Sequence, residues 1–275
     1  MKHRLNVRHY LRYSDDFVLV HEDPAQLLAW RAQIESFLAE QLRLSLKDPS
    51  ARPQRISNGV DFLGYIVRPD YLLVRRRVVN RLKARLRDSE QQLVRPQSGH
   101  TVFRHDPETL AGLRATWASY LAHLTMANSY RLRERLVSWC GWVRHFFVIE
   151  DGLLVPIMKI PPVFQRLTDQ YRFFTKRLTE CLLLFQVGCF YECYDEQAEW
   201  MSRVLGLRPL DRRRGFRVRC GVPVGLGAGR VRALVARGIP VAMIKEIKDR
   251  PWLTGVKPRA LAIVWQPVTE GVERR

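Results

Sequence analysis

The chain has 275 residues, 47% of them hydrophobic and 10% aromatic, so it can form two compact domains and is too apolar for a disordered chain. Lys and Arg outnumber Asp and Glu by 46 to 27, which gives a formal net charge of +19 spread over both halves of the chain. This surplus predicts a polyanionic partner such as nucleic acid, although a ribosomal-type or merely soluble basic protein would have the same composition.

The cysteines and the apolar runs indicate in which cellular compartment the protein resides. The five cysteines include no Cys-x-x-Cys pair, which favours free thiols in a reducing environment over a zinc site. The longest apolar run, residues 181–191, is interrupted by Gln186 and is too short to cross a bilayer. No apolar core follows the basic N-terminus as it would in a signal peptide. We therefore expect a cytoplasmic protein with no membrane partner.

The first part of the chain, residues 1–74, predicts an α+β region. Residues 9–21 have the pattern of a strand, a tight turn and a second strand. Residues 24–46 carry apolar side chains at helical spacing and predict an amphipathic helix over one sheet face. Two further strand signals, at 60–67 and 71–74, are separated by a Pro-containing turn.

The remainder of the chain predicts two further regions. Residues 75–155 are expected to be mostly helical, opening with Arg75-Arg76-Arg77 and containing a loop around residues 95–106. Three prolines then mark a boundary. Helix and strand signals alternate over residues 160–270, which is typical of a mixed α/β domain.

Residues 1–150 contain three features whose order along the chain is informative. They are Tyr13-Ser14-Asp15-Asp16, the predicted helix, and the segment Gly59-Val60-Asp61-Phe62-Leu63-Gly64-Tyr65. In this order the chain resembles the C-terminal part of bacterial reverse transcriptases of the group II intron and diversity-generating retroelement type, with a partial palm sheet at 1–74 and a helical thumb at 75–155. An isolated Asp-Asp pair would be weak support, because most such pairs are turn residues.

The reverse transcriptase resemblance implies roles for particular residues. Asp15 and Asp16 would be catalytic and would bind Mg²⁺, with Asp15 the more direct ligand. Phe62, Leu63, Gly64 and Tyr65 would form the primer grip. Arg75, Arg76 and Arg77 would contact phosphates of the nucleic acid.

The resemblance also has a gap, because these polymerases take a further metal-binding Asp from an earlier strand. No Asp or Glu precedes Asp15. We expect the chain to be inactive as a polymerase without a missing upstream half, which would be its protein partner. A gene fragment, an internal start and a split enzyme all remain open.

Residues 160–270 resemble the N-terminal mismatch-recognition domain of MutS proteins. The similarity is carried by Phe185-Gln186-Val187-Gly188-Cys189-Phe190-Tyr191-Glu192-Cys193-Tyr194-Asp195 and is reinforced by Gly221-Val222-Pro223 and residues 234–246. It implies that Phe190 enters a destabilised base step and that Glu192 hydrogen-bonds the displaced base. On a strand these two side chains share one face. The alternative is that Phe190 and Tyr191 are core aromatics and Glu192 is a solvent-exposed charge.

Two observations limit this second resemblance. No Gly-x-x-x-x-Gly-Lys-Ser/Thr loop occurs, so no ATP site is evident. Arg212, Arg213 and Arg214 form a basic loop that is either a phosphate contact or a solvated turn.

Taken together, these patterns predict the C-terminal portion of an RNA-directed DNA polymerase with an appended domain that binds mismatched DNA, and a primer–template duplex as the nucleic-acid partner. The alternative is a non-catalytic protein that binds mismatched duplex. A MutS-type repair function is weaker, because the ATPase is missing.

Overall fold

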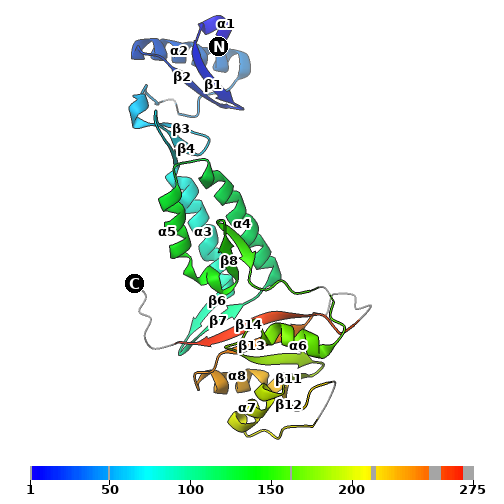
Figure 1. Cartoon of the computed structure of the whole chain (residues 1–275). Helices are drawn as coiled ribbons and strands as arrows, with labels where there is room; N and C mark the ends of the chain where they lie inside the picture. The colour runs from blue at the N-terminus through cyan, green and yellow to red at the C-terminus, as the bar shows by residue number, and fades with distance from the viewer. Residues whose placement is uncertain (1, 49, 162, 212–214, 248–254, 269–275) are drawn as a thin grey trace. The chain divides into compact units, whose positions relative to one another are not determined.

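The computed structural model describes every residue except 1, 49, 162, 212–214, 248–254 and 269–275. Figure 1 shows the chain and labels many of its helices and strands. The chain divides into two compact units. The first comprises Met1–Val79 and Leu124–Tyr130, and the second comprises Asn80–His123 and Arg131–Arg275. Most of the region predicted as a thumb therefore belongs to the same unit as the C-terminal α/β region.

The first unit begins with a hairpin and a helix, as the sequence predicts. Its elements are α1 (Lys2–Leu5), β1 (His9–Tyr13), β2 (Asp16–Val20) and α2 (Pro24–Phe37), which continues as a π-helical turn η1 (Leu38–Leu42). Asp23 caps α2, since its side chain accepts a hydrogen bond of 2.8 Å from the backbone N–H of Ala25. The helical region ends at Leu42 rather than Leu46, because Arg43 adopts a left-handed backbone with φ 52°.

The predicted strand over residues 60–67 is wrong in one respect, because it is a hairpin. The elements are η2 (Ile56–Asn58), β3 (Val60–Phe62), β4 (Tyr65–Val67) and β5 (Leu72–Val74). Leu63 and Gly64 have φ values of 50° and 85°, and Phe62 pairs directly with Tyr65, so a two-residue turn reverses the chain. Strands β3, β4 and β5 form one sheet and β1 and β2 another. Within the described residues the expected palm strands do not form a single sheet.

Three helices of the second unit match the predicted helical region. They are α3 (Arg76–Leu93), α4 (Pro107–Thr125) and α5 (Tyr130–Trp139), and a 3₁₀ turn η3 (Gly141–His145) follows. Leu82, Leu86 and Leu93 recur at helical spacing on α3 and are all buried. The guanidinium of Arg85 lies 5.9 Å from the ring centroid of Tyr120 on α4, and that of Arg87 lies 5.3 Å from Trp139 on α5.

The expected loop around residues 95–106 is a β-hairpin, so this prediction is wrong. It consists of β6 (Val94–Gln97) and β7 (His100–Arg104), joined by a turn at Gly99 with φ 78°. Strand β7 pairs antiparallel with β14 (Arg259–Pro267), and its Val102 and Phe103 are buried. Pro96 conceals the strand in the sequence, but the structure tolerates it because β6 is an edge strand.

A second hairpin replaces the end of the predicted helical region. Strands β8 (Phe147–Glu150) and β9 (Leu153–Pro156) pair antiparallel around a turn at Asp151 and Gly152, which have φ values of 50° and 80°. The indole N–H of Trp117 donates a 2.7 Å hydrogen bond to the carbonyl of Gly152. This bond ties the hairpin to α4.

The seven-stranded sheet of the second unit has the order β12-β11-β10-β13-β14-β7-β6, in which only β10 and β13 are parallel. Its remaining strands are β10 (Leu182–Val187), β11 (Phe190–Tyr194), β12 (Arg219–Pro223) and β13 (Val241–Glu246). Side chains of β10 alternate between two buried clusters. Leu184 packs with residues of α7 (Glu196–Leu205) and α8 (Gly227–Val235), which follows the short turn η4 (Val224–Leu226), while Phe185 packs with α6 (Leu167–Thr175). The mixed-sheet α/β prediction for this part is confirmed.

No helix among the described residues is long and apolar enough to cross a membrane.

His105 lies at the junction between the β6–β7 hairpin and η3. Its ring centroid is 4.8 Å from that of Phe146. Burial, with a smaller contribution from His145, lowers the pKa of His105 from 6.5 to about 4, and burial also lowers the pKa of His145. Between these pH values the unfolded chain binds protons that the folded chain does not. His105 therefore does not reduce the free energy of unfolding above pH 6.5. It reduces that free energy progressively as the pH falls from 6.5 towards 4.

We therefore expect the free energy of unfolding to fall between pH 7 and pH 4.5, and to fall by about 2 kcal/mol less in His105→Leu. Urea titrations at both pH values measure this difference. His100→Leu, on the same hairpin, is the matched control and should keep the wild-type pH response. An unchanged pH response in His105→Leu would contradict the assignment.

Candidate nucleic-acid interface

The tip of the β10–β11 hairpin presents one aromatic side chain to solvent. Gly188, with φ 63°, and Cys189 form the turn, and Val187 pairs with Phe190 across it. Phe190 is 42% exposed, whereas the next residue, Tyr191, is 4% exposed and packs in the core. Of the two aromatics, Phe190 is therefore available to a ligand and Tyr191 is a core residue.

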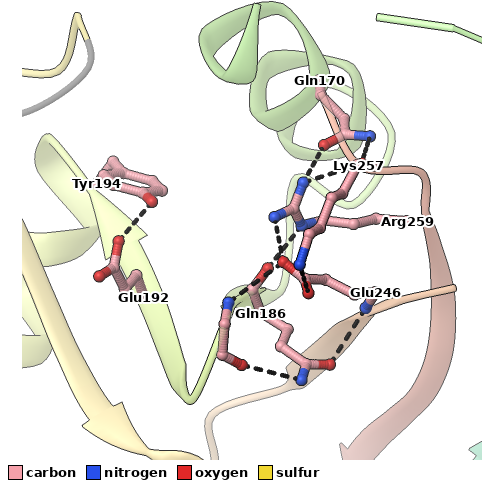
Figure 2. Close-up of polar contacts among 8 residues, drawn as sticks. Gln170, Gln186, Glu192, Tyr194, Glu246, Lys257 and Arg259 are labelled. Atoms are coloured by element: carbon pink, nitrogen blue, oxygen red, sulfur yellow. Dashed lines mark hydrogen bonds and ion pairs between the residues drawn. The ribbon is translucent and has the colours of Figure 1, made fainter. Parts of the chain in front are cut away.

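Glu192 shares the strand face of Phe190, but it is buried, with 5% exposure. One carboxylate oxygen accepts a 2.6 Å hydrogen bond from the hydroxyl of Tyr194, and the other lies 3.0 Å from a guanidinium nitrogen of Arg219. Figure 2 shows the contact with Tyr194. Gly221 lies opposite Glu192, and a Cβ there would be 3.2 Å from the Cγ of Glu192. Glu192 is neither a solvent charge nor an unoccupied acceptor.

Arg259, at the start of β14, is the centre of a buried polar network beside this tip (Figure 2). It is 3% exposed. Its Nη2 donates to a carboxylate oxygen of Glu246 at 2.6 Å, and its Nε donates to the carbonyl of Gln186 at 2.5 Å. Its Nη1 donates to the side-chain oxygen of Gln170 on α6 at 2.8 Å and to the carbonyl of Lys257 at 3.0 Å. One guanidinium thus joins the ends of three strands to a helix.

The same network holds the backbone of the hairpin turn. The N–H of Gly188 donates to Glu246 at 3.2 Å, and the carbonyl of Gly188 accepts from the side-chain amide of Gln186 at 3.2 Å. The side-chain oxygen of Gln186 accepts from the N–H of Glu246 at 3.1 Å. Because both backbone groups of Gly188 are bonded, the turn that carries Phe190 is held in one geometry.

A hollow of about 890 Å³ adjoins Phe190. Glu192 and Glu246 line it, each paired with an arginine, and the exposed Arg166 and Lys257 add positive charge. Lys257 lies 3.5 Å from Glu246. The charged side chains beside the exposed aromatic ring therefore carry a net positive charge, which suits a polyanion.

The structure adds four residues to the predicted site: Arg259, Glu246, Gln170 and Arg219. Arg259 opens a mostly apolar strand, and a charge at the start of such a strand is a signal for a buried partner. That signal does not name Glu246, which precedes Arg259 by thirteen positions and reaches it through the pairing of β13 with β14.

The arginines that were predicted to contact phosphate have different surroundings in the structure. Arg75 lies 2.5 Å from the carboxylate of Asp61, so its charge is already paired. Arg76 and Arg77 are exposed on the first turn of α3, and their contact with phosphate stays a prediction. Arg212, Arg213 and Arg214 lie outside the described residues.

Asp15 and Asp16 lie at the turn between β1 and β2, where Ser14 has φ 54° and Tyr13 pairs with Asp16. Both carboxylates are exposed. The described part of the chain contains no group of three or more His, Cys, Asp or Glu residues that could hold a metal ion. Mg²⁺ is commonly held by one or two carboxylates together with waters and substrate phosphates, so the binding of Mg²⁺ by Asp15 and Asp16 stays a prediction.

The primer-grip residues Phe62, Leu63, Gly64 and Tyr65 form the β3–β4 turn described above. The carbonyl of Gly64 accepts a 2.9 Å hydrogen bond from the N–H of Arg75. This bond ties the turn to the residue before α3. Their contact with a primer stays a prediction.

We expect Arg259→Met to lower the free energy of unfolding by about 3–5 kcal/mol. The variant removes the buried cation that bonds Glu246 at 2.6 Å and leaves that carboxylate with the exposed Lys257, at 3.5 Å, as its cationic partner. Lys257→Met is the matched control. The Lys257 side chain is 49% exposed, so its loss should cost about 0–1 kcal/mol. Urea unfolding measures both. Adding Glu246→Leu to Arg259→Met should restore part of the stability, and equal losses in the two single variants would contradict the network.

Comparisons with known proteins agree with the geometry of this region. Residues 165–272 match the family model of MutS domain I. The DNA mismatch repair protein MutS of Carboxydothermus hydrogenoformans is 32% identical over 109 residues, which cover 38% of this chain and 13% of that protein. MutS of Aquifex pyrophilus is 35% identical over 104 residues, covering 36% of this chain and 12% of that protein.

The chain thus spans about 13% of the length of such a curated relative. These comparisons give no support to a reverse transcriptase part. Residues 165–272 are a MutS domain I-like α/β domain, and they carry Phe190, Glu192 and the Arg259 network.

Proposed function

We propose that the protein is a non-catalytic nucleic-acid-binding protein whose C-terminal domain recognises mismatched DNA duplex. The observation that carries this proposal is the exposed Phe190 at a turn whose backbone is bonded on both sides by the Arg259–Glu246 network. The similarity of this domain to MutS domain I supports it, since the relatives are named DNA mismatch repair proteins.

Phe190 acts as a wedge between base pairs. Insertion of an apolar side chain from the minor groove unstacks a base step at a cost of a few kcal/mol, and this cost is smallest where pairing is already weak. A backbone turn that is already held in one geometry loses little conformational entropy when the ring inserts. Because the turn is fixed before DNA binds, the preference for a mismatched duplex depends on how easily the base step of that duplex unstacks.

Glu192 contributes to mismatch recognition by exchanging one of its hydrogen-bond partners for the displaced base. Its two carboxylate oxygens are engaged by Tyr194 and Arg219, so reading a displaced base requires one of these contacts to open. Arg219 also neutralises the carboxylate, which lowers the cost of bringing a polyanion close to it.

The positive charge supplies the part of the affinity that does not depend on sequence. With a formal net charge of +19, binding is expected to weaken steeply with salt for matched and mismatched duplexes alike. The preference for a mismatch is therefore measured at one fixed salt concentration.

We expect Phe190→Ala to reduce the preference for a G·T duplex over the matched duplex by about tenfold, with smaller loss of matched-duplex affinity. Fluorescence anisotropy with labelled duplexes measures both constants. Leu153→Ala, which removes a similarly exposed side chain (47%) from the β8–β9 hairpin, is the control and should leave the preference intact. An unchanged preference in Phe190→Ala would disprove the wedge.

A second candidate function rests on the turn that presents Asp15 and Asp16 side by side. Under this proposal the first unit is a polymerase portion that binds Mg²⁺ only when an upstream half supplies further carboxylates. The two functions are separable by experiment, since Asp15 and Phe190 belong to different compact units.

We expect Asp15→Asn to leave duplex binding unchanged in Mg²⁺ or EDTA, because the proposed binding residues do not use this carboxylate. Asp16→Asn should behave in the same way. Anisotropy titrations and a primer-extension assay on the same preparations test this. Mg²⁺-dependent extension by the wild type that Asp15→Asn abolishes would favour the polymerase over the binding protein.

A further inference from the structure

A second hollow, of about 610 Å³, lies in the second unit and shares no lining residue with the hollow beside Phe190. Its walls come from the end of β7 and the start of α4, from η3 and the β9 end, from the segment between α6 and β10, and from β14. Small-molecule sites have volumes of about 300–1,000 Å³. The hollow therefore has room for one nucleotide.

One wall of this cleft is aromatic. His145 stacks on Phe103 with ring centroids 3.8 Å apart and 25° between the planes, and it remains exposed beyond that contact. Phe146 packs edge-on against Phe103 at 6.1 Å. Burial lowers the pKa of both His145 and His105, which favours the uncharged form of each ring. Phe103 and Phe146 are buried, with 5% and 3% exposure. The exposed ring of His145, backed by Phe103, therefore offers the planar surface on which a base can stack.

The rim of the cleft is cationic. Arg114, Arg144 and Arg177 line it, against a single carboxylate from Glu180. Arg177 is partly engaged, since it lies 3.8 Å from the ring centroid of Phe173 and donates to its carbonyl. Arg114 and Arg144 are exposed, and among the described residues neither has a carboxylate within 4.0 Å. Guanidinium groups so placed suit the phosphate of a bound nucleotide.

We propose that this cleft binds one unpaired nucleotide of a single strand, with its base on the exposed face of His145 and its phosphate on Arg114 and Arg144. An aromatic ring beside two arginines accepts any nucleotide, because every nucleotide has a flat base and a phosphate. The site is distinct from the wedge at Phe190 and does not depend on it. It would let the protein hold a single-stranded end or gap.

The test uses the whole chain and a 5′-phosphorylated deoxyadenosine trinucleotide, which is too short to form a duplex and so does not engage a duplex site. Isothermal titration calorimetry at one salt concentration should show saturable binding. An abasic trinucleotide backbone and inorganic phosphate should each bind at least about tenfold more weakly, because they lack the stacking base.

Variants then locate the site. Arg114→Gln with Arg144→Gln should weaken trinucleotide binding at least about tenfold, and Arg114→Lys with Arg144→Lys should recover part of it. His145→Ala should weaken the trinucleotide but not the abasic backbone, and Phe190→Ala should change neither. Unfolding curves identify any variant that fails to fold.

Three results would overturn the proposal. They are equal affinity for the trinucleotide and the abasic backbone, wild-type affinity in the double Gln variant, and the absence of saturable binding. Each leaves the mismatch proposal intact, since that depends on the duplex preference and on Phe190.

Discussion

The geometry of the candidate interface depends on the ion pair between Arg259 and Glu246. The two charges are nearly buried, and their 2.6 Å contact is accompanied by hydrogen bonds to Gln186, Gln170 and Gly188. A buried pair is costly to assemble, but it is far more costly to leave half-made. The strand ends, α6 and the hairpin turn are therefore held together, and the exposed ring of Phe190 takes its position from contacts that it does not itself make.

The MutS domain I-like region is integrated with the chain before it. Strands β6 and β7, from residues 94–104, extend its sheet by pairing β7 with β14. Without them β14 would present an open edge, and Phe103 and Val102 would lose their burial. The helices next to this hairpin belong to the same compact unit. The domain is thus built into a larger fold in which α3, α4 and α5 take part.

In the function proposed above, the positive charge supplies affinity for nucleic acid, and the exposed ring supplies the preference for a mismatch. The excess of arginine attracts any nucleic acid and carries no information about pairing. Under our proposal, discrimination between matched and mismatched duplexes comes from the apolar ring of Phe190, whose insertion depends on the cost of unstacking. The cleft at His145 combines both features on a smaller scale. A protein of this kind needs no catalytic group to distinguish nucleic-acid structures.

The sequence by itself determined the local features. Apolar spacing indicated α3 and α4, alternation in Phe185–Asp195 placed Phe190 and Glu192 on one face, and the arginine excess indicated a polyanionic partner. Only the tertiary structure decided that Glu192 is buried with Arg219, that Arg259 reaches Glu246, and that the supposed loop at 95–106 joins a distant sheet. Periodicity reports which side of an element is apolar. Pairing between strands far apart in the chain depends on the packed fold, which no local pattern encodes.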